Sequence, residues 1–236
     1  KKGRAATFGI RGSLSPMEGS VLWGEFAHQF GHRIVAAGTF DAEGAASDDY
    51  AAWAADLGID YTASDVAWTP TIGGEWVWFS GDEGDITDGT NTAGSAIGGW
   101  DPVYRGRFFS ALRDFQGAGF YLPAQSGATA VGPFMPLTNA TTNQHGLSLH
   151  GMVKPIEDLT IDNKFSWFLA DKGIRPTVDS KKRHFYGTEL DVQANYNYTD
   201  DVQIGAIWGI FMPGSVFRNP YDESSQELVT SVSVKF

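Results

Sequence analysis

The chain of 236 residues contains no cysteine. This absence excludes a disulfide framework, a thiolate metal site and a cysteine nucleophile. Positive charge is also scarce, because 17 Lys and Arg stand against 28 Asp and Glu and give a formal net charge of −11. Nucleic-acid affinity depends largely on a cationic surface, so we expect no nucleic-acid partner.

Long apolar runs are missing as well. No run approaches the ~20 apolar residues of a membrane-spanning helix, and no apolar signal-peptide stretch follows Lys1. A membrane location is still open, because strands of ~9–11 alternating residues also cross a bilayer. The 29 Gly and 10 Pro favour strands joined by turns over a helical fold, and the 14% of aromatic residues argues against disorder.

The clearest strand signal lies between residues 185 and 197, where apolar and polar side chains alternate over more than ten positions. Such alternation is typical of a strand with one apolar and one polar face. Tyr186 and Tyr196 end the apolar row, and we expect both to lie in the aromatic girdles of a membrane barrel. The apolar row consists of Tyr186, Thr188, Leu190, Val192, Ala194 and Tyr196.

The same pattern, weaker in the first half, predicts nine strands. Their ranges are 5–13, 21–32, 49–60, 68–80, 147–153, 159–169, 185–197, 202–212 and 226–236. Short connections (14–20, 61–67, 154–158, 199–201) alternate strictly with long ones (33–48, 81–144, 171–184, 213–225). We therefore predict an all-β fold, a transmembrane antiparallel up-and-down β-barrel with nine strands in this chain, or ten if residues 34–40 form another.

Several segments carry a family resemblance. They are Gly187-Thr-Glu-Leu-Asp191, Phe211-Met-Pro-Gly-Ser215, residues 50–58, residues 70–82 and Trp100-Asp-Pro-Val-Tyr104. Together they resemble the alginate-export family of outer-membrane porins. The alternating Val residues before the terminal Phe236 are similar to the signal by which the outer-membrane assembly machinery recognises barrel proteins.

This resemblance implies a bacterial outer-membrane barrel of roughly eighteen strands that exports or admits hydrophilic solutes, anionic or neutral. Intact bacterial barrels have an even number of strands, so we expect residues 1–236 to form one barrel domain that lacks N-terminal strands. Residues 81–144 would be its long extracellular or pore loop. The implied partners are outer-membrane lipid, the assembly machinery through Phe236, a hydrophilic solute and a periplasmic or extracellular protein.

The polar rows of the predicted strands would face the lumen and set its selectivity, as rings of charge do in channels. Alternatively, these residues only pair with one another inside a wet interior. The set mixes both signs, whereas an alginate exporter should present clustered cations. The predicted pore-lining residues are Arg11, Glu25, Gln29, Asp162, Lys164, Glu189, Asp191, Gln193, Asn195 and Lys235.

The long loop contains two further candidates. Arg105, Arg107 and Arg113 could fold inward as a constriction, or the loop could pack on its own aromatic residues. An oxygen-rich run could hold a structural Ca²⁺, but it does not fit the EF-hand spacing, and a solvated acidic loop is the favoured interpretation. That run contains Asp82, Glu83, Asp85 and Asp88.

Histidine gives two candidate metal pairs, His28 with His32 and His145 with His150, but neither has a third ligand nearby in sequence. Apart from the calcium candidate, we expect no cofactor. No Gly-x-Ser-x-Gly elbow is present, and we do not expect an enzyme.

The leading functional hypothesis is a passive outer-membrane channel. A second is a structural barrel that sheathes or anchors a partner protein without conducting. A third is a soluble β-sandwich that binds carbohydrate through surface Trp residues.

Overall fold

The computed structural model describes residues 4–34, 47–81, 99–100, 143–174, 181–217 and 222–235. These residues form one nine-stranded sheet, and none of them is helical. The strands are β1 (Arg4–Leu14), β2 (Ser20–Ile34), β3 (Ser47–Thr62), β4 (Thr71–Phe79), β5 (Gln144–Ile156), β6 (Leu159–Ile174), β7 (Arg183–Asn197), β8 (Val202–Pro213) and β9 (Ser225–Val234).

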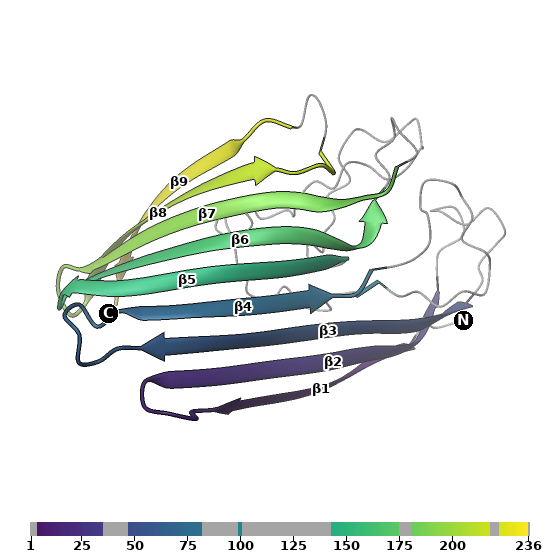
Figure 1. The fold of residues 1–236 in the computed structure, drawn as a ribbon, viewed down its shortest axis with the longest axis horizontal. Coiled ribbons are helices and arrows are strands. Elements are labelled where there is room, and N and C mark those ends of the chain that lie inside the picture. Colours follow the sequence, from purple (N-terminus) through teal and green to yellow (C-terminus); the bar gives the residue numbers. More distant parts are fainter. Residues whose placement is uncertain are drawn as a thin grey trace.

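Each strand pairs antiparallel with the next one in sequence, so the sheet order is β1 to β9 without a crossover (Figure 1). The predicted all-β, up-and-down arrangement of nine strands is therefore confirmed. The sheet is curled, but within the described residues it is open, with β1 and β9 as its two edges. The tenth strand considered at 34–40 falls beyond Ile34, outside the described residues.

The connections alternate in length as predicted. Four short connections, residues 15–19, 63–70, 157–158 and 198–201, lie together at one end of the sheet (Figure 1). We call this the turn end and the opposite one the loop end. The last turn is closed locally, because the Thr199 hydroxyl accepts hydrogen bonds from the backbone N–H groups of Asp201 and Val202.

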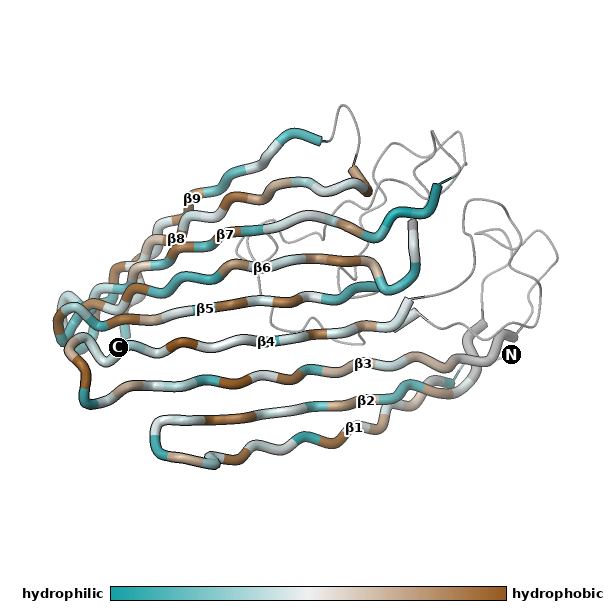
Figure 2. Tube along the Cα trace, viewed as in Figure 1, coloured by the Kyte–Doolittle hydropathy of each residue, from teal (hydrophilic) through white to brown (hydrophobic). Residues whose placement is uncertain are grey.

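The ladder register separates the side chains into two faces. Apolar residues oppose apolar ones from strand to strand, as in Ile10 with Phe26 and Leu190 with Ile210, and hydropathy alternates along each strand (Figure 2). We call this side the apolar face and the other the polar face. Large exposed side chains of the apolar face are Phe8, Ile10, Phe26, Phe30, Leu57, Ile59, Leu147, Leu149, Val192, Ile204, Leu228 and Val232. None of the described residues belongs to a helix long and apolar enough to span a membrane.

One prediction about these faces is wrong. Tyr186 is only 3% exposed and does not lie in an aromatic girdle. The β6–β7 register shifts after Phe168, and Gly187 has φ +145°. Tyr186 consequently joins a buried cluster with Phe168, Ala170, Phe211 and Val216. A bulge of this kind changes the direction of one side chain, and the two-residue alternation of the sequence does not reveal it.

Gly187 generates a testable prediction. Its φ is strained for any residue with a side chain, and a Cβ there would meet the Met212 carbonyl oxygen and the Phe211 ring. We expect Gly187→Ala to lower the free energy of unfolding by about 1–3 kcal/mol in urea titrations. Gly151→Ala is the matched control, because its nearest neighbour, the Asn163 side chain, is 3.4 Å away. Equal stability of the two variants would contradict this account of the bulge.

Candidate functional site

The structure places nine of the ten predicted pore-lining residues on the polar face. Three ladder pairs show the placement: Arg11 lies opposite Glu25, Lys164 opposite Asp191, and Asp162 opposite Gln193. The tenth, Lys235, follows the end of β9, and its backbone N–H donates to the Asp201 carbonyl at 2.9 Å.

Four carboxylates on the polar face were missed by the sequence reasoning. They are Asp56 and Asp60 on β3, Glu75 on β4 and Glu227 on β9, each in register with polar-face residues of neighbouring strands. A signal for the first two was present, since both alternate with the apolar Leu57 and Ile59. Ala and Gly at neighbouring polar-face positions made the alternation of polar and apolar residues harder to recognise.

Two side-chain contacts on the polar face, one an ion pair and one a histidine–carboxylate hydrogen bond, reach across an intervening strand. Lys164 Nζ on β6 lies 2.9 Å from Glu75 Oε2 on β4, and Ser148 of β5 stands between the two strands. His150 Nε2 on β5 donates to the Asp60 carboxylate oxygen Oδ1 on β3 at 2.6 Å. Strands two apart are separated by roughly 9–10 Å, so only a small intervening residue leaves room for such contacts.

Gly73 supplies that room between Asp60 and His150. A Cβ on Gly73 would meet both Asp60 Oδ1 and His150 Nε2. Gly58 has the same role nearer the sheet edge, where the indole of its cross-strand partner Trp23 lies over it. Glycine on this face is therefore needed for the close approach of side chains from neighbouring strands.

Carboxylates of like charge lie side by side on β2, β3 and β4. Glu25 and Asp56 are directly opposite in the β2–β3 ladder, and Asp56 is within electrostatic reach of Glu75. Directly opposed side chains have Cβ atoms about 4.5–5.5 Å apart, where like charges destabilise the pair. Asp56 Oδ1 is buried and has no hydrogen-bond partner. We call Glu25, Asp56 and Glu75 the acidic arc.

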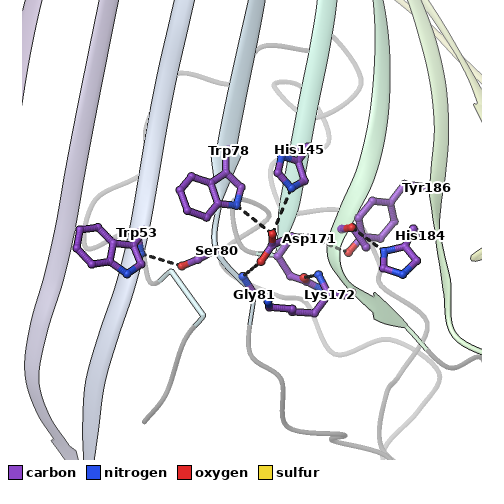
Figure 3. A network of polar contacts seen from close by, with 11 residues as sticks. Trp53, Trp78, Ser80, Gly81, His145, Asp171, Lys172, His184 and Tyr186 are labelled. Carbon is purple, nitrogen blue, oxygen red and sulfur yellow. Dashed lines mark hydrogen bonds and ion pairs between the residues drawn. The ribbon is translucent and has the colours of Figure 1, made fainter.

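At the loop end, Asp171 is the centre of a hydrogen-bond network (Figure 3). Its carboxylate accepts from the Trp78 indole N–H at 3.2 Å and from the Gly81 backbone N–H at 2.9 Å. Its Oδ1 also lies 3.2 Å from His145 Nε2. The Trp76, Trp78 and His145 rings stack with centroids 5.9–6.3 Å apart.

Asn143 extends this network to β6 and β7. Its side-chain oxygen accepts from the Lys172 backbone N–H at 2.6 Å, and its amide donates back to the Lys172 carbonyl at 3.1 Å. The Tyr186 hydroxyl donates to the Asn143 carbonyl at 3.2 Å. Since Ser80 Oγ also accepts from the Trp53 backbone N–H, the network joins the loop ends of β3 through β7.

The proposed histidine metal pairs find little support. His145 and His150 lie on opposite faces of β5, because they are five positions apart, so they cannot share an ion and this hypothesis is wrong. His28 stacks on Trp53 with centroids 3.7 Å apart, and its Nδ1 is 3.1 Å from the Ala52 carbonyl. Across the described ranges, no group of three or more His, Asp or Glu is arranged to hold a metal ion.

Three predicted features fall outside the described residues: the constriction of Arg105, Arg107 and Arg113, the calcium loop with Asp82, Glu83, Asp85 and Asp88, and the terminal Phe236. They stay predictions.

No protein-family model matches the chain, and no curated protein shows significant similarity. Among solved structures, the NanC porin in a rhombohedral crystal form aligns with 98% of this chain and 94% of its own, at a TM-score of 0.38 and 10% identity. So low a similarity transfers neither fold nor function, and the resemblance to the alginate-export family stays a prediction from the quoted residues.

The Asp171 network predicts a specific loss of stability. We expect Asp171→Ala to cost about 1–3 kcal/mol, because the Trp78 and Gly81 N–H groups lose their acceptor in a largely buried place. Thermal unfolding followed by Trp fluorescence measures the effect. Asp65→Ala, in an exposed turn, is the control, and we expect it to change stability by no more than ~0.5 kcal/mol. A similar melting temperature for both variants would show that the network does not stabilise the loop end.

Proposed function

We propose that this chain forms the wall of a β-barrel channel in a bacterial outer membrane, through which hydrophilic solutes pass. The observation that carries the proposal is the contrast between the two faces of a single sheet. One face exposes large apolar side chains over all nine strands, with Leu228 68% exposed, whereas the other carries ion pairs and carboxylates. Lipid outside and water inside would satisfy both faces.

The aromatic residues support this placement in a bilayer. Tyr61, Trp68, Tyr196 and Tyr198 are exposed near the turn end, and Trp53 is exposed toward the loop end. On β3, Trp53 and Tyr61 are eight residues apart, or ~27 Å along the strand. A strand tilted by ~40° converts this to a height of ~20 Å, close to the ~25 Å apolar band of outer-membrane barrels.

The open sheet adds a geometric requirement. Because the strands alternate in direction, β1 and β9 run the same way and cannot pair antiparallel. A closed barrel therefore needs either one parallel seam or an odd number of further strands. The predicted larger barrel would satisfy this requirement, and alginate export is the finer function that the family resemblance suggests.

The alternatives differ in what they require. A soluble sandwich needs a second sheet over the apolar face, and the described residues form one sheet only. A non-conducting scaffold barrel would share the whole architecture and differ only in whether solute passes.

Conductance of the natively purified protein in a planar bilayer tests the proposal, with intact mass checked and symmetric KCl on both sides. We expect steady ohmic steps. Reproducible insertion without conductance would replace the channel by a scaffold barrel. Solubility in detergent-free buffer without insertion would overturn the membrane location itself.

A substitution tests which face meets lipid. Val192 lies midway along β7 on the apolar face and is 37% exposed. We expect Val192→Arg to lower the unfolding free energy in lipid by about 2–4 kcal/mol, the cost of a cation near the bilayer midplane. Gln193→Arg, one residue away on the polar face, should have a much smaller effect. The reverse order would mean that the faces are assigned the wrong way round.

A further inference from the structure

We infer that the channel favours cations over anions, and that the polar face of β2, β3 and β4 generates this preference. The inference rests on the proposed function, because it describes the solutes that pass along the same wall. The inference adds a charge preference to the proposed channel. The wall charge that it requires is negative, whereas a polyanion exporter needs a positively charged wall.

The charge on the polar face is strongly unbalanced. Among the residues that stand in regular ladder register with described side chains, eight carboxylates face two fixed positive charges, Arg11 and Lys164. The carboxylates are Glu25, Asp56, Asp60, Glu75, Asp162, Glu189, Asp191 and Glu227. The pore-lining residues predicted from the sequence included only four of these acids, Glu25, Asp162, Glu189 and Asp191. Without the other four, positive and negative charges were similar in number.

The imbalance does not depend on the deeply placed acids. Glu189 is 0% and Asp191 7% exposed, so a passing solute would not contact them directly. Without these two, six carboxylates still face the same two cations.

One of these two cations is paired with a carboxylate, and the other lies opposite one. Lys164 lies 2.9 Å from Glu75, and Arg11 is directly opposite Glu25 in the β1–β2 ladder. Lys164 is therefore not available to attract an anion on its own. His150, the one histidine in regular ladder register on the polar face among the described side chains, is paired with Asp60.

Within the acidic arc, the unbalanced negative charge lies at Glu25 and Asp56, because Glu75 is paired with Lys164. Glu25 and Asp56 oppose each other across one ladder step, and Asp56 Oδ1 is buried without a hydrogen-bond partner. Mutual repulsion in such an arrangement is offset whenever a mobile cation is close by. The arc acts as a field along the wall rather than as a bound-ion site, and charge of one sign on a low-dielectric wall raises the local concentration of counter-ions.

The solute class follows from this field. Small cations such as K⁺ and Na⁺, and solutes that carry an amine, would be admitted in preference to chloride. A polyanion with one carboxylate per sugar would meet repulsion from the acidic arc at every unit.

Reversal potentials across a planar bilayer test the inference on the natively purified full chain. A tenfold KCl gradient with ~0.1 M on the concentrated side keeps the screening length near 10 Å, so wall charges act on ions in transit. We expect a K⁺-to-Cl⁻ permeability ratio above one. Raising the concentrated side to ~1 M should bring the ratio closer to one, because screening shortens to about 3 Å.

Two double variants locate the effect. Glu25→Gln with Asp56→Asn removes two charges of the arc without breaking the Lys164–Glu75 pair, and it should lower the permeability ratio markedly. Glu157→Gln with Asp158→Asn removes the same charge from an exposed turn and should leave the ratio near that of the unchanged protein. Lys164→Gln releases Glu75 and should raise the ratio, which provides a test in the opposite direction if the first variant does not fold.

The outcomes separate the two proposals. A conducting channel with a ratio at or below one overturns the cation preference and leaves the channel function intact. If the variant with Glu25→Gln and Asp56→Asn conducts and its permeability ratio is unchanged, the cation preference does not come from the polar face of β2, β3 and β4. Absence of conductance in the unchanged protein overturns the channel function, and the selectivity inference falls with it.

Discussion

The continuous antiparallel ladder from β1 to β9 is the constraint on which the remaining features depend. In each strand successive side chains point to opposite sides, so a shift of one residue in any ladder would exchange the faces of every strand beyond it. The eight ladders instead keep apolar residues opposite apolar residues, from Ile10 and Phe26 on β1 and β2 to Trp208 and Leu228 on β8 and β9. Turns of two to eight residues at the turn end help to fix that register. The two faces therefore have separate chemistry over the whole sheet.

Small residues on the polar face determine which charges meet. Gly73 and Ser148 lie beneath the contacts that join β3 to β5 and β4 to β6. A larger side chain at either position would occupy the space that Asp60, His150, Glu75 and Lys164 use. The pairs are consequently set by what lies between the strands as much as by the charged residues themselves. Lys164 and His150 are both used in these pairs, so Glu75 is the member of the acidic arc whose charge is balanced.

The loop end is organised differently from the rest of the sheet. There the regular alternation gives way to the β6–β7 register shift and to the Asp171 and Asn143 networks, which join strands β3 to β7 through side chains. The buried cluster of Phe168, Tyr186 and Phe211 lies beside this region. A barrel-like wall needs such reinforcement where its strands end, since the ladder hydrogen bonds stop there.

The sequence by itself determined nearly all of the fold: nine strands, their approximate bounds, the alternation of short and long connections, and the side of each strand that is apolar. Each of these depends only on local alternation and turn chemistry, which a single chain displays residue by residue. Tertiary structure alone decided the rest. The burial of Tyr186, the opposite faces of His145 and His150, the ion pairs that reach across β4 and β5, and the juxtaposition of Glu25, Asp56 and Glu75 all depend on ladder register and on bulges. Register is a relation between strands far apart in sequence, so no repeat within one strand reveals it.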